Sequence, residues 1–162
     1  AETIVVTAAL APQPEDRAPA SVTIIEADRV ERLGEPLLEN LLRLVPSTSL
    51  SLAGPAGSQA QVRIRGAEAN HTLLFIDGIR ANDPAAGNEP RFELLSADLA
   101  DGIEVVRGPQ SALWGSEAIG GVVALTASPQ TGITATAEAG SHGFGRVGGS
   151  AGLSDEIGRA HV

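Results

Sequence analysis

The chain has 162 residues, a net charge of −9 and a pI near 4.7, which excludes the basic face that nucleic-acid binding requires. Cysteine is absent and every basic residue is arginine, so disulfides, thiol nucleophiles, zinc–thiolate sites and catalytic or P-loop lysines are excluded. Aromatic residues make up only 2%, so a core must be built from Leu, Val, Ile and Ala, and no apolar run is long enough for a transmembrane helix.

The chain begins with a short β-prone run, Ala-Glu-Thr-Ile-Val-Val-Thr-Ala over residues 1–8. A proline-rich stretch, Ala11–Pro19, follows and is expected to act as a flexible linker. An extended apolar peptide on such a tether suits strand addition to the sheet edge of a partner, and the alternative is a frayed terminal strand. No secretory signal peptide is visible at the start, so either it has been cleaved or the chain is cytosolic.

The next segment predicts one strand and two helices. Ser21–Ile25 is rich in β-branched residues, and Ala27–Leu33 is expected to be a short helix that ends at Gly34. A second helix begins at Pro36 and stops at Pro46. Its apolar face, which we expect to be core, is formed by Leu37, Leu38, Leu41, Leu42 and Val45.

The middle of the chain alternates loops with apolar runs. Asp77-Gly78 lies between two such runs and predicts a tight hairpin turn. The elements expected here are a loop over Ser47–Ala60, strands over Gln61–Arg65 and Thr72–Ile76, a turn-rich loop over Ala81–Arg91 and a short helix over Phe92–Ala97.

A glycine-rich turn then separates two β-branched strands. Ile103–Arg107 is interrupted at Gly108-Pro109, and Val122–Ala127 begins after the pair Gly120-Gly121. Glycines at such points allow a positive φ or a close approach of two backbones. We therefore expect a strand, a short helical turn and a second strand.

Beyond Ser128 the sequence pattern changes to a strict alternation of small apolar and polar residues. Residues 133–139 and 147–153 alternate on either side of a turn at Gly140–Gly145, and Ser154–Gly158 and Arg159–Val162 are expected to be a further turn and the start of a strand. Period-two segments of about ten residues are typical of transmembrane barrel strands. These residues suffice for roughly three spans, whereas a plugged transporter barrel has about 22 strands, so we expect the chain to hold only the start of a barrel.

Three motifs together resemble the plug domain of TonB-dependent outer-membrane receptors. They are Arg-Gly-Pro at 107–109 with Trp-Gly at 114–115 and Ile-Gly-Gly at 119–121, Val-Arg-Ile-Arg-Gly at 62–66 with Leu-Leu-Phe-Ile-Asp-Gly at 73–78, and Leu-Leu-Arg-Leu-Val-Pro at 41–46. The sequence departs from the family pattern at Ser47, where a glycine is usual. The resemblance runs from Glu2 to about Leu153.

The resemblance implies an α+β fold. The expected organisation is a TonB box and flexible linker over residues 1–19, a small plug domain with a mixed β-sheet and short helices over 20–128, and the first hairpin of an incomplete transmembrane β-barrel over 129–162. It also implies active import of a scarce nutrient across the outer membrane of a Gram-negative bacterium, with the plug inside the barrel, its N-terminus in the periplasm and no cofactor. The residues of these motifs resemble those of the cobalamin-receptor branch of the family. The resemblance therefore implies a corrinoid as the ligand, with a ferric siderophore or haem as the near alternative.

The partner implied by the resemblance is the TonB C-terminal domain. The residues that would bind it are Glu2, Thr3, Ile4, Val5, Val6, Thr7 and Ala8. The resemblance also implies that Arg65 and Arg107 pair with glutamates of the barrel wall and so hold the plug in place. The alternative is that each is a surface arginine with a local acidic neighbour such as Glu104.

Ligand contacts are implied for three loops of the plug, and the alternative is that these loops are merely solvated. The candidate substrate-facing residues are Ser51, Ser58, Gln59, Asn70, His71, Asn82, Asp83, Asn88 and Arg91.

Catalysis and resident metals find no support in the residue pattern. The acidic residues around Asp77–Glu93 do not have EF-hand spacing, and His71, His142 and His161 are too dispersed for a zinc site. Gly143–Gly148 spells G-x-G-x-x-G but does not open a helix in a βαβ unit, so we interpret it as a glycine-rich hairpin. The rival to a receptor plug is a free-standing soluble module that kept the plug fold and binds a ligand or partner without transport.

Overall fold

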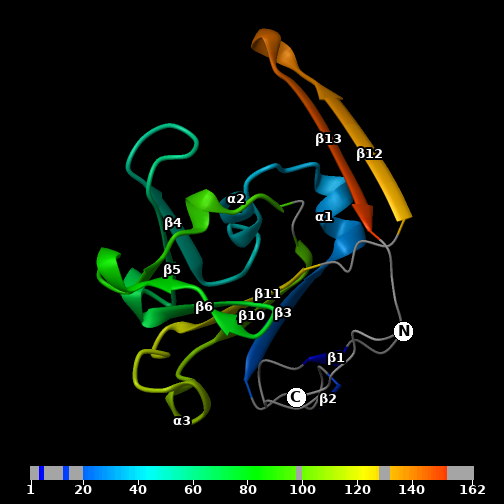
Figure 1. Cartoon of the computed structure of the whole chain (residues 1–162). Coiled ribbons are helices and arrows are strands. Elements are labelled where there is room, and N and C mark those ends of the chain that lie inside the picture. Colours follow the sequence, from blue (N-terminus) through cyan, green and yellow to red (C-terminus); the bar gives the residue numbers. More distant parts are fainter. Residues whose placement is uncertain (1–3, 6–12, 15–19, 98–99, 128–131, 153–162) are drawn as a thin grey trace. The chain divides into compact units, whose positions relative to one another are not determined.

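The computed structural model describes residues 4–5, 13–14, 20–97, 100–127 and 132–152 (Figure 1). The chain divides into two units, Ala1–Ala127 and Ser128–Val162, and each is considered by itself. No helix in the described ranges is long and apolar enough to cross a membrane.

A five-stranded mixed sheet with the order β3-β10-β11-β6-β7 organises the first unit. Its strands are β3 (Ser21–Glu26), β10 (Ala100–Arg107), β11 (Gly121–Ala127), β6 (Thr72–Ile76) and β7 (Ile79–Arg80). Only the β11–β6 pair is parallel, and β10 lies antiparallel to both β3 and β11. The central strands are continuous runs of Val, Ile and Leu because both of their faces are covered.

Two apolar layers sandwich this sheet. One face packs against α1 (Ala27–Leu33) and α2 (Leu38–Leu42), whose buried side chains join those of Ile25, Ile103 and Val123. The other face holds Leu73, Phe75, Val106 and Val122 under the short helix α3 (Ser111–Trp114). Figure 1 shows α1 and α2 on one side of the sheet and α3 on the other.

Both predicted helices are present, but the second is shorter than the predicted span from Pro36 to Pro46, since α2 covers only Leu38–Leu42 and Leu37 is its half-buried N-cap. Gly34 ends α1 in the left-handed conformation, with φ of 58° and its N–H donating to two carbonyls of the last turn. Leu38, Leu41 and Leu42 are fully buried, and Val45 follows them into the same core.

The loop predicted over Ser47–Ala60 is wrong in its first part. Thr48–Leu52 forms strand β4, which pairs antiparallel with β5 (Ala60–Ile64). The sequence did not predict this strand because three of its residues are serine or threonine. Only Leu50 packs against the core, and the strand is largely exposed. The predicted strand Gln61–Arg65 is β5 shifted by one residue, since Arg65 has already turned to a φ of 54°.

The hairpin predicted at Asp77-Gly78 is confirmed. Asp77 and Gly78 both have positive φ, 49° and 79°, as a two-residue type I′ turn requires, and β6 pairs with β7 across them. The Asp77 carboxylate also accepts a hydrogen bond from the N–H of Ala127 at 2.8 Å, which extends the β6–β11 ladder by one rung. Asp77 is therefore a structural turn residue, as its pattern indicated.

The segment between β7 and β10 differs from the prediction in both of its parts, because the turn-rich loop expected over Ala81–Arg91 holds a small β-hairpin. It contains the short strands β8 (Asn82–Asp83) and β9 (Glu89–Pro90), joined by the 3₁₀ turn η3 (Pro84–Ala86). The helix expected over Phe92–Ala97 is only the 3₁₀ turn η4 (Phe92–Leu94). Beyond it, Ser96 makes an isolated β-bridge with Leu37, and that extended pairing competes with helix formation.

The second unit is one antiparallel hairpin. Strands β12 (Gly132–Ala139) and β13 (Gly145–Gly152) flank the 3₁₀ turn η6 (Ser141–Gly143), as the alternation predicted. The register places Ile133 opposite Ala151 and Ala137 opposite Val147, so the small apolar residues share one face. Ile133 and Val147 are each 87% exposed, so nothing in the described structure covers that face. The predicted turn at 154–158 and the strand start at 159–162 lie outside the described residues.

Candidate functional site

Two of the three loops predicted to face a ligand are tied together by one carboxylate. Glu89 of β9 accepts hydrogen bonds from the Nε2 atoms of Gln59, at 3.2 Å, and Gln61, at 3.0 and 3.1 Å. Gln59 ends the β4–β5 connection and Gln61 lies on β5. The third loop joins them, because its 3₁₀ turn η2 (Ala69–His71) packs against both β5 and β9. The structure thus gathers all three segments into one region, which we call the loop cluster.

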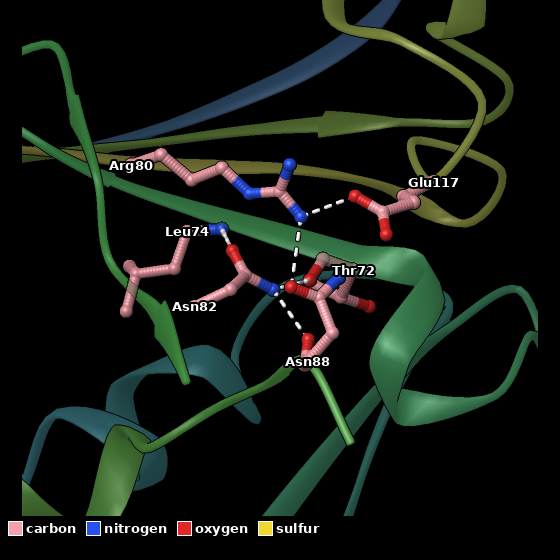
Figure 2. Close-up of polar contacts among 6 residues, drawn as sticks. All are labelled: Thr72, Leu74, Arg80, Asn82, Asn88 and Glu117. Atoms are coloured by element: carbon pink, nitrogen blue, oxygen red, sulfur yellow. Dashed lines mark hydrogen bonds and ion pairs between the residues drawn. The ribbon is translucent and has the colours of Figure 1, made fainter. Parts of the chain in front are cut away.

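Asn82, one of the predicted ligand residues, is instead bonded to the protein backbone (Figure 2). Its Oδ1 accepts from the N–H of Leu74 at 2.9 Å, and its Nδ2 donates to the carbonyls of Thr72 at 3.0 Å and Asn88 at 2.8 Å. The side chain therefore acts as an extra strand partner along the edge of β6, where β7 does not reach. It also fixes the far end of the β8–β9 loop.

Arg80 is a residue that sequence reasoning missed. Its Nη2 donates to Oδ1 of Asn88 at 2.9 Å and forms an ion pair with Glu117, in the turn before β11 (Figure 2). Arg80 is the register partner of Phe75, whose ring packs against Trp114 at a centroid distance of 4.4 Å. One cross-strand pair thus holds segment 111–120 by an aromatic contact and an ion pair. The placement of Arg80 two residues after the Asp77-Gly78 turn was the available signal.

Other predicted ligand residues also have local structural partners. Asp83 caps η3 by accepting from the N–H of Ala85 at 2.9 Å. Nε of Arg91 lies 2.7 Å from Oε1 of Glu93, an ion pair in which the Glu93 side chain is almost fully buried. The backbone of His71 bonds to Glu68 on one side and receives the N–H of Gly120 on the other.

Two predicted ligand residues keep unused polar atoms. Oδ1 of Asn70 and Oγ of Ser58 are buried and have no hydrogen-bond partner among the described residues. Ser51 is exposed on β4, opposite Gln61 in the ladder. Within the described part of the chain, Ser51 thus presents an exposed hydroxyl on the loop cluster, whereas Asn82, Asp83 and Arg91 have structural partners of their own.

Arg65 and Arg107 lie at the same end of the sheet. Nη2 of Arg65 donates to the Ser21 hydroxyl at 3.3 Å, and Ser21 is the register partner of Arg107. Nη1 of Arg107 donates to the carbonyl of Pro46 at 3.3 Å, while its buried Nε has no hydrogen-bond partner. Among the described residues neither arginine forms an ion pair, and none joins Arg107 to Glu104. Two arginines therefore lie at this end of the sheet without a carboxylate of the described residues paired to either.

The predicted partner-binding segment Glu2–Ala8 is only partly within the described residues. Its residues Ile4–Val5 form strand β1, which pairs antiparallel with β2 (Gln13–Pro14) in the linker. The segment is thus extended at its centre, as strand addition would require. Glu2, Thr3, Val6, Thr7 and Ala8 lie outside the described residues.

No metal centre is found in the described ranges, where no three His, Asp or Glu residues cluster in a way that could hold an ion.

Comparison with known proteins identifies a family and several similar structures. The family described as TonB-dependent Receptor Plug Domain matches residues 14–122. Similar solved structures include the siderophore receptor PiuA of Acinetobacter baumannii, with 25% identity and a TM-score of 0.67, which covers 83% of this chain and 18% of PiuA. The ferric enterobactin receptor PfeA of Pseudomonas aeruginosa shows 28% identity and a TM-score of 0.56, covering 72% of this chain and 19% of PfeA.

The pyoverdine receptor FpvA of Pseudomonas aeruginosa shares the fold at 19% identity, with a TM-score of 0.68 over 83% of this chain and 17% of FpvA. The chain thus spans less than a fifth of each of these receptors.

Proposed function

The chain belongs to the TonB-dependent receptor plug domain family, and we propose that it gates an outer-membrane receptor that imports a ferric siderophore. The family match over residues 14–122 carries this proposal, because it spans four strands of the five-stranded sheet, the start of β11 and the loop cluster. The ligand class is supported by PiuA and PfeA, two siderophore receptors that are 25% and 28% identical to this chain. A corrinoid is the second candidate, supported by the motif phrasing around Asp77-Gly78 and Gly120-Gly121.

In this proposal the plug sits inside a barrel whose first hairpin is β12–β13. The hairpin has one face of small apolar residues, whereas Glu138 and Arg146 pair at 3.9 Å on the other face. A lipid-facing apolar side and a polar lumen side would suit this division. Ligand binding at the loop cluster would change the exposure of Glu2–Ala8, which engages the TonB C-terminal domain by strand addition. Ser51, which is exposed on β4, is the first plug side chain that we expect to contact ligand.

Deletion of Glu2–Ala8 from the full receptor is expected to abolish energised uptake while leaving ligand binding at the cell surface intact. The physical reason is that the segment supplies the mechanical link to TonB, whereas the loops expected to bind ligand come from residues 51–91 of the chain. The measurement is uptake of ⁵⁵Fe-siderophores and of labelled cobalamin by cells that carry the receptor, with and without the deletion. Substitution of the linker residues Glu15 and Asp16 by Ala is the matched control.

If cells take up one class of ligand and lose that uptake when Glu2–Ala8 is deleted, the result supports the proposal and identifies the ligand class. Uptake that is indifferent to the deletion contradicts the TonB link. Absence of uptake for every ligand favours the rival function, a soluble plug-like binding module.

We also propose that Arg65 and Arg107 latch the plug to acidic residues of the barrel wall. Two guanidinium groups and a buried unpartnered Nε form a site that a carboxylate would complete with charge-assisted hydrogen bonds. The double change Arg65→Ala and Arg107→Ala is expected to loosen the plug, so that large antibiotics permeate several-fold faster. The control is Arg32→Ala, which removes an exposed arginine paired with Asp28. Equal permeability of all three strains would contradict the latch.

A further inference from the structure

Glu39 carries a buried carboxyl group that takes no part in the functions proposed above. It lies on α2 among Leu38, Leu41 and Leu42 and is 1% exposed. Its Oε2 is buried without a hydrogen-bond partner among the described residues. A carboxylate in such a place is costly, because an ionised group needs a counter-charge or several hydrogen bonds when it leaves water.

The charged groups around Glu39 do not neutralise it. Glu93 faces it from η4, but the Glu93 carboxylate is already engaged by Arg91 and by the N–H of Ala60. Glu35, just before α2, accepts from the Leu37 N–H and from Nδ2 of Asn40. Arg43 follows at the C-terminal end of α2 and is its nearest positive charge.

The two strands that pack against α2 add no counter-charge. Strand β4 has no ionisable residue. On β5, Arg63 is exposed and donates to Oε1 of Gln61. Burial raises the pKa of Glu39, and the negative charges of Glu93 and Glu35 raise it further, against a partial offset from a backbone N–H and Arg43.

We propose that the protonated side chain of Glu39 holds α2 against η4 and β5, a role that we call the pin. Loss of the proton releases α2 from η4 and β5 while the sheet stays folded. Among the described residues, few hydrogen bonds cross the contact that would open, between Pro36–Leu38 and Leu95–Ala97, which we call the seam. The N–H of Leu38 donates to the carbonyl of Leu95 at 3.3 Å, and the N–H of Ala97 donates to that of Pro36 at 3.0 Å. Helix α2 has only five residues, so it cannot persist without its tertiary contacts.

The direction of the pH effect follows from linkage. Because the pKa of Glu39 is higher in the folded plug than in the unfolded chain, the stabilisation is complete below the unfolded value of about 4.3. It is lost as pH rises through the folded-state pKa. Neutral and alkaline conditions therefore loosen the seam, and acid tightens it. This inference does not depend on transport, so it can fail while the proposed function holds, and the reverse.

Amide hydrogen exchange on the 162-residue chain tests the pin directly. Between about pH 4 and about pH 8, after correction for intrinsic exchange rates, we expect protection at Leu38 and Ala97 to fall. Protection at Val106 and Val123, in the β10–β11 ladder, should stay constant. Protection at Leu38 and Ala97 that is equal at both pH values would overturn the proposal.

The variant Glu39→Gln keeps the shape but cannot ionise, so it should remove the pH dependence. Glu35→Gln changes a neighbouring carboxylate that is hydrogen-bonded and only partly buried, and it should keep most of the dependence. If protection at Leu38 and Ala97 in Glu39→Gln depended on pH as it does in the wild type, the proposal would also be overturned. Should that variant fold poorly, ¹³C NMR of the wild-type carboxyl decides instead. We expect Glu39 to titrate above the ordinary value of a glutamate, about 4.3, and titration at or below that value would refute the pin.

Discussion

The substitution Gly121→Ala is expected to destabilise the plug by more than about 3 kcal/mol, a large share of the stability of a domain of this size. Gly121 opens β11 and is paired on both sides, with Arg107 of β10 and Thr72 of β6. A Cβ added there would lie well inside the van der Waals contact distance of the Val106 carbonyl oxygen and 3.1 Å from Cδ1 of Ile64. The carbonyl belongs to a central strand and cannot move without breaking the ladder.

Both close contact and backbone conformation contribute to this penalty. The φ of Gly121 is 158°, a backbone conformation that L side chains rarely adopt, so alanine would be strained there in addition to the contact. Urea unfolding followed by fluorescence of Trp114, the single tryptophan, would measure the loss. Trp114 packs against Phe75 on the sheet and therefore reports on the opening of the element that Gly121 supports.

Gly102 provides the matched control for this experiment. It lies on β10, in the same sheet, and a Cβ added there meets no atom within 4 Å. Gly102→Ala should be neutral, or stabilising by up to about 1 kcal/mol through the unfolded state. Equal urea midpoints for the two variants would show that close packing at the start of β11 is not what requires glycine there.

The elements that the sequence predicted well are those whose local chemistry and burial agree. Asp77-Gly78 can adopt the positive φ values of a type I′ turn, and β-branched runs flank it, so turn and strands specify one hairpin. The alternation at 133–139 and 147–152 likewise fixes a register that keeps apolar residues on one face. In both places local preference and pairing point to the same structure.

The failures occur where tertiary contacts decide. Strand β4 is polar and exposed, and it exists because β5 offers it a ladder, which no local pattern reveals. The helix expected after Phe92 yields to the bridge between Leu37 and Ser96, residues nearly sixty positions apart. Propensity is a weak prior where a distant partner supplies the hydrogen bonds.

The candidate site was predictable as loops but not as side chains. Sequence reasoning chose Asn82 and Asn88 because polar loop residues often bind ligands. It could not see that Asn82 completes the edge of β6 or that Asn88 accepts hydrogen bonds from Asn82 and Arg80. Arg80 and Glu117 were missed because their pairing joins segments that only the parallel β6–β11 contact brings together. The gathering of three loops by Glu89 has the same origin.

The substitution Asn82→Asp is expected to cost about 3 kcal/mol, because it replaces a donor by an acceptor between two carbonyl oxygens. Nδ2 of Asn82 lies 3.0 Å from the oxygen of Thr72 and 2.8 Å from that of Asn88. A carboxylate oxygen in that position faces both carbonyls without a hydrogen atom between them. The bond from the Leu74 N–H would survive, because Oδ1 is retained.

Asn82→Ala separates this repulsion from simple loss of the bonds. It removes all three contacts and leaves the Leu74 N–H and the Thr72 carbonyl to find water at a partly buried edge, so about 2 kcal/mol is expected. Urea unfolding at neutral pH would rank the variants, and acidification should recover part of the loss in Asn82→Asp only, because a protonated carboxyl regains one donor.

Asn88→Asp is the matched control, because the same chemical change occurs in the same loop. Oδ1 of Asn88 only accepts a hydrogen bond from Arg80, and an aspartate can still accept it. Its φ of 66° is tolerated by aspartate as it is by asparagine. We expect a change below about 0.5 kcal/mol. If Asn88→Asp were as costly as Asn82→Asp, the added charge in the loop, and not the lost bonds to β6, would be responsible, and Asn82 would again be a candidate for direct contact with ligand.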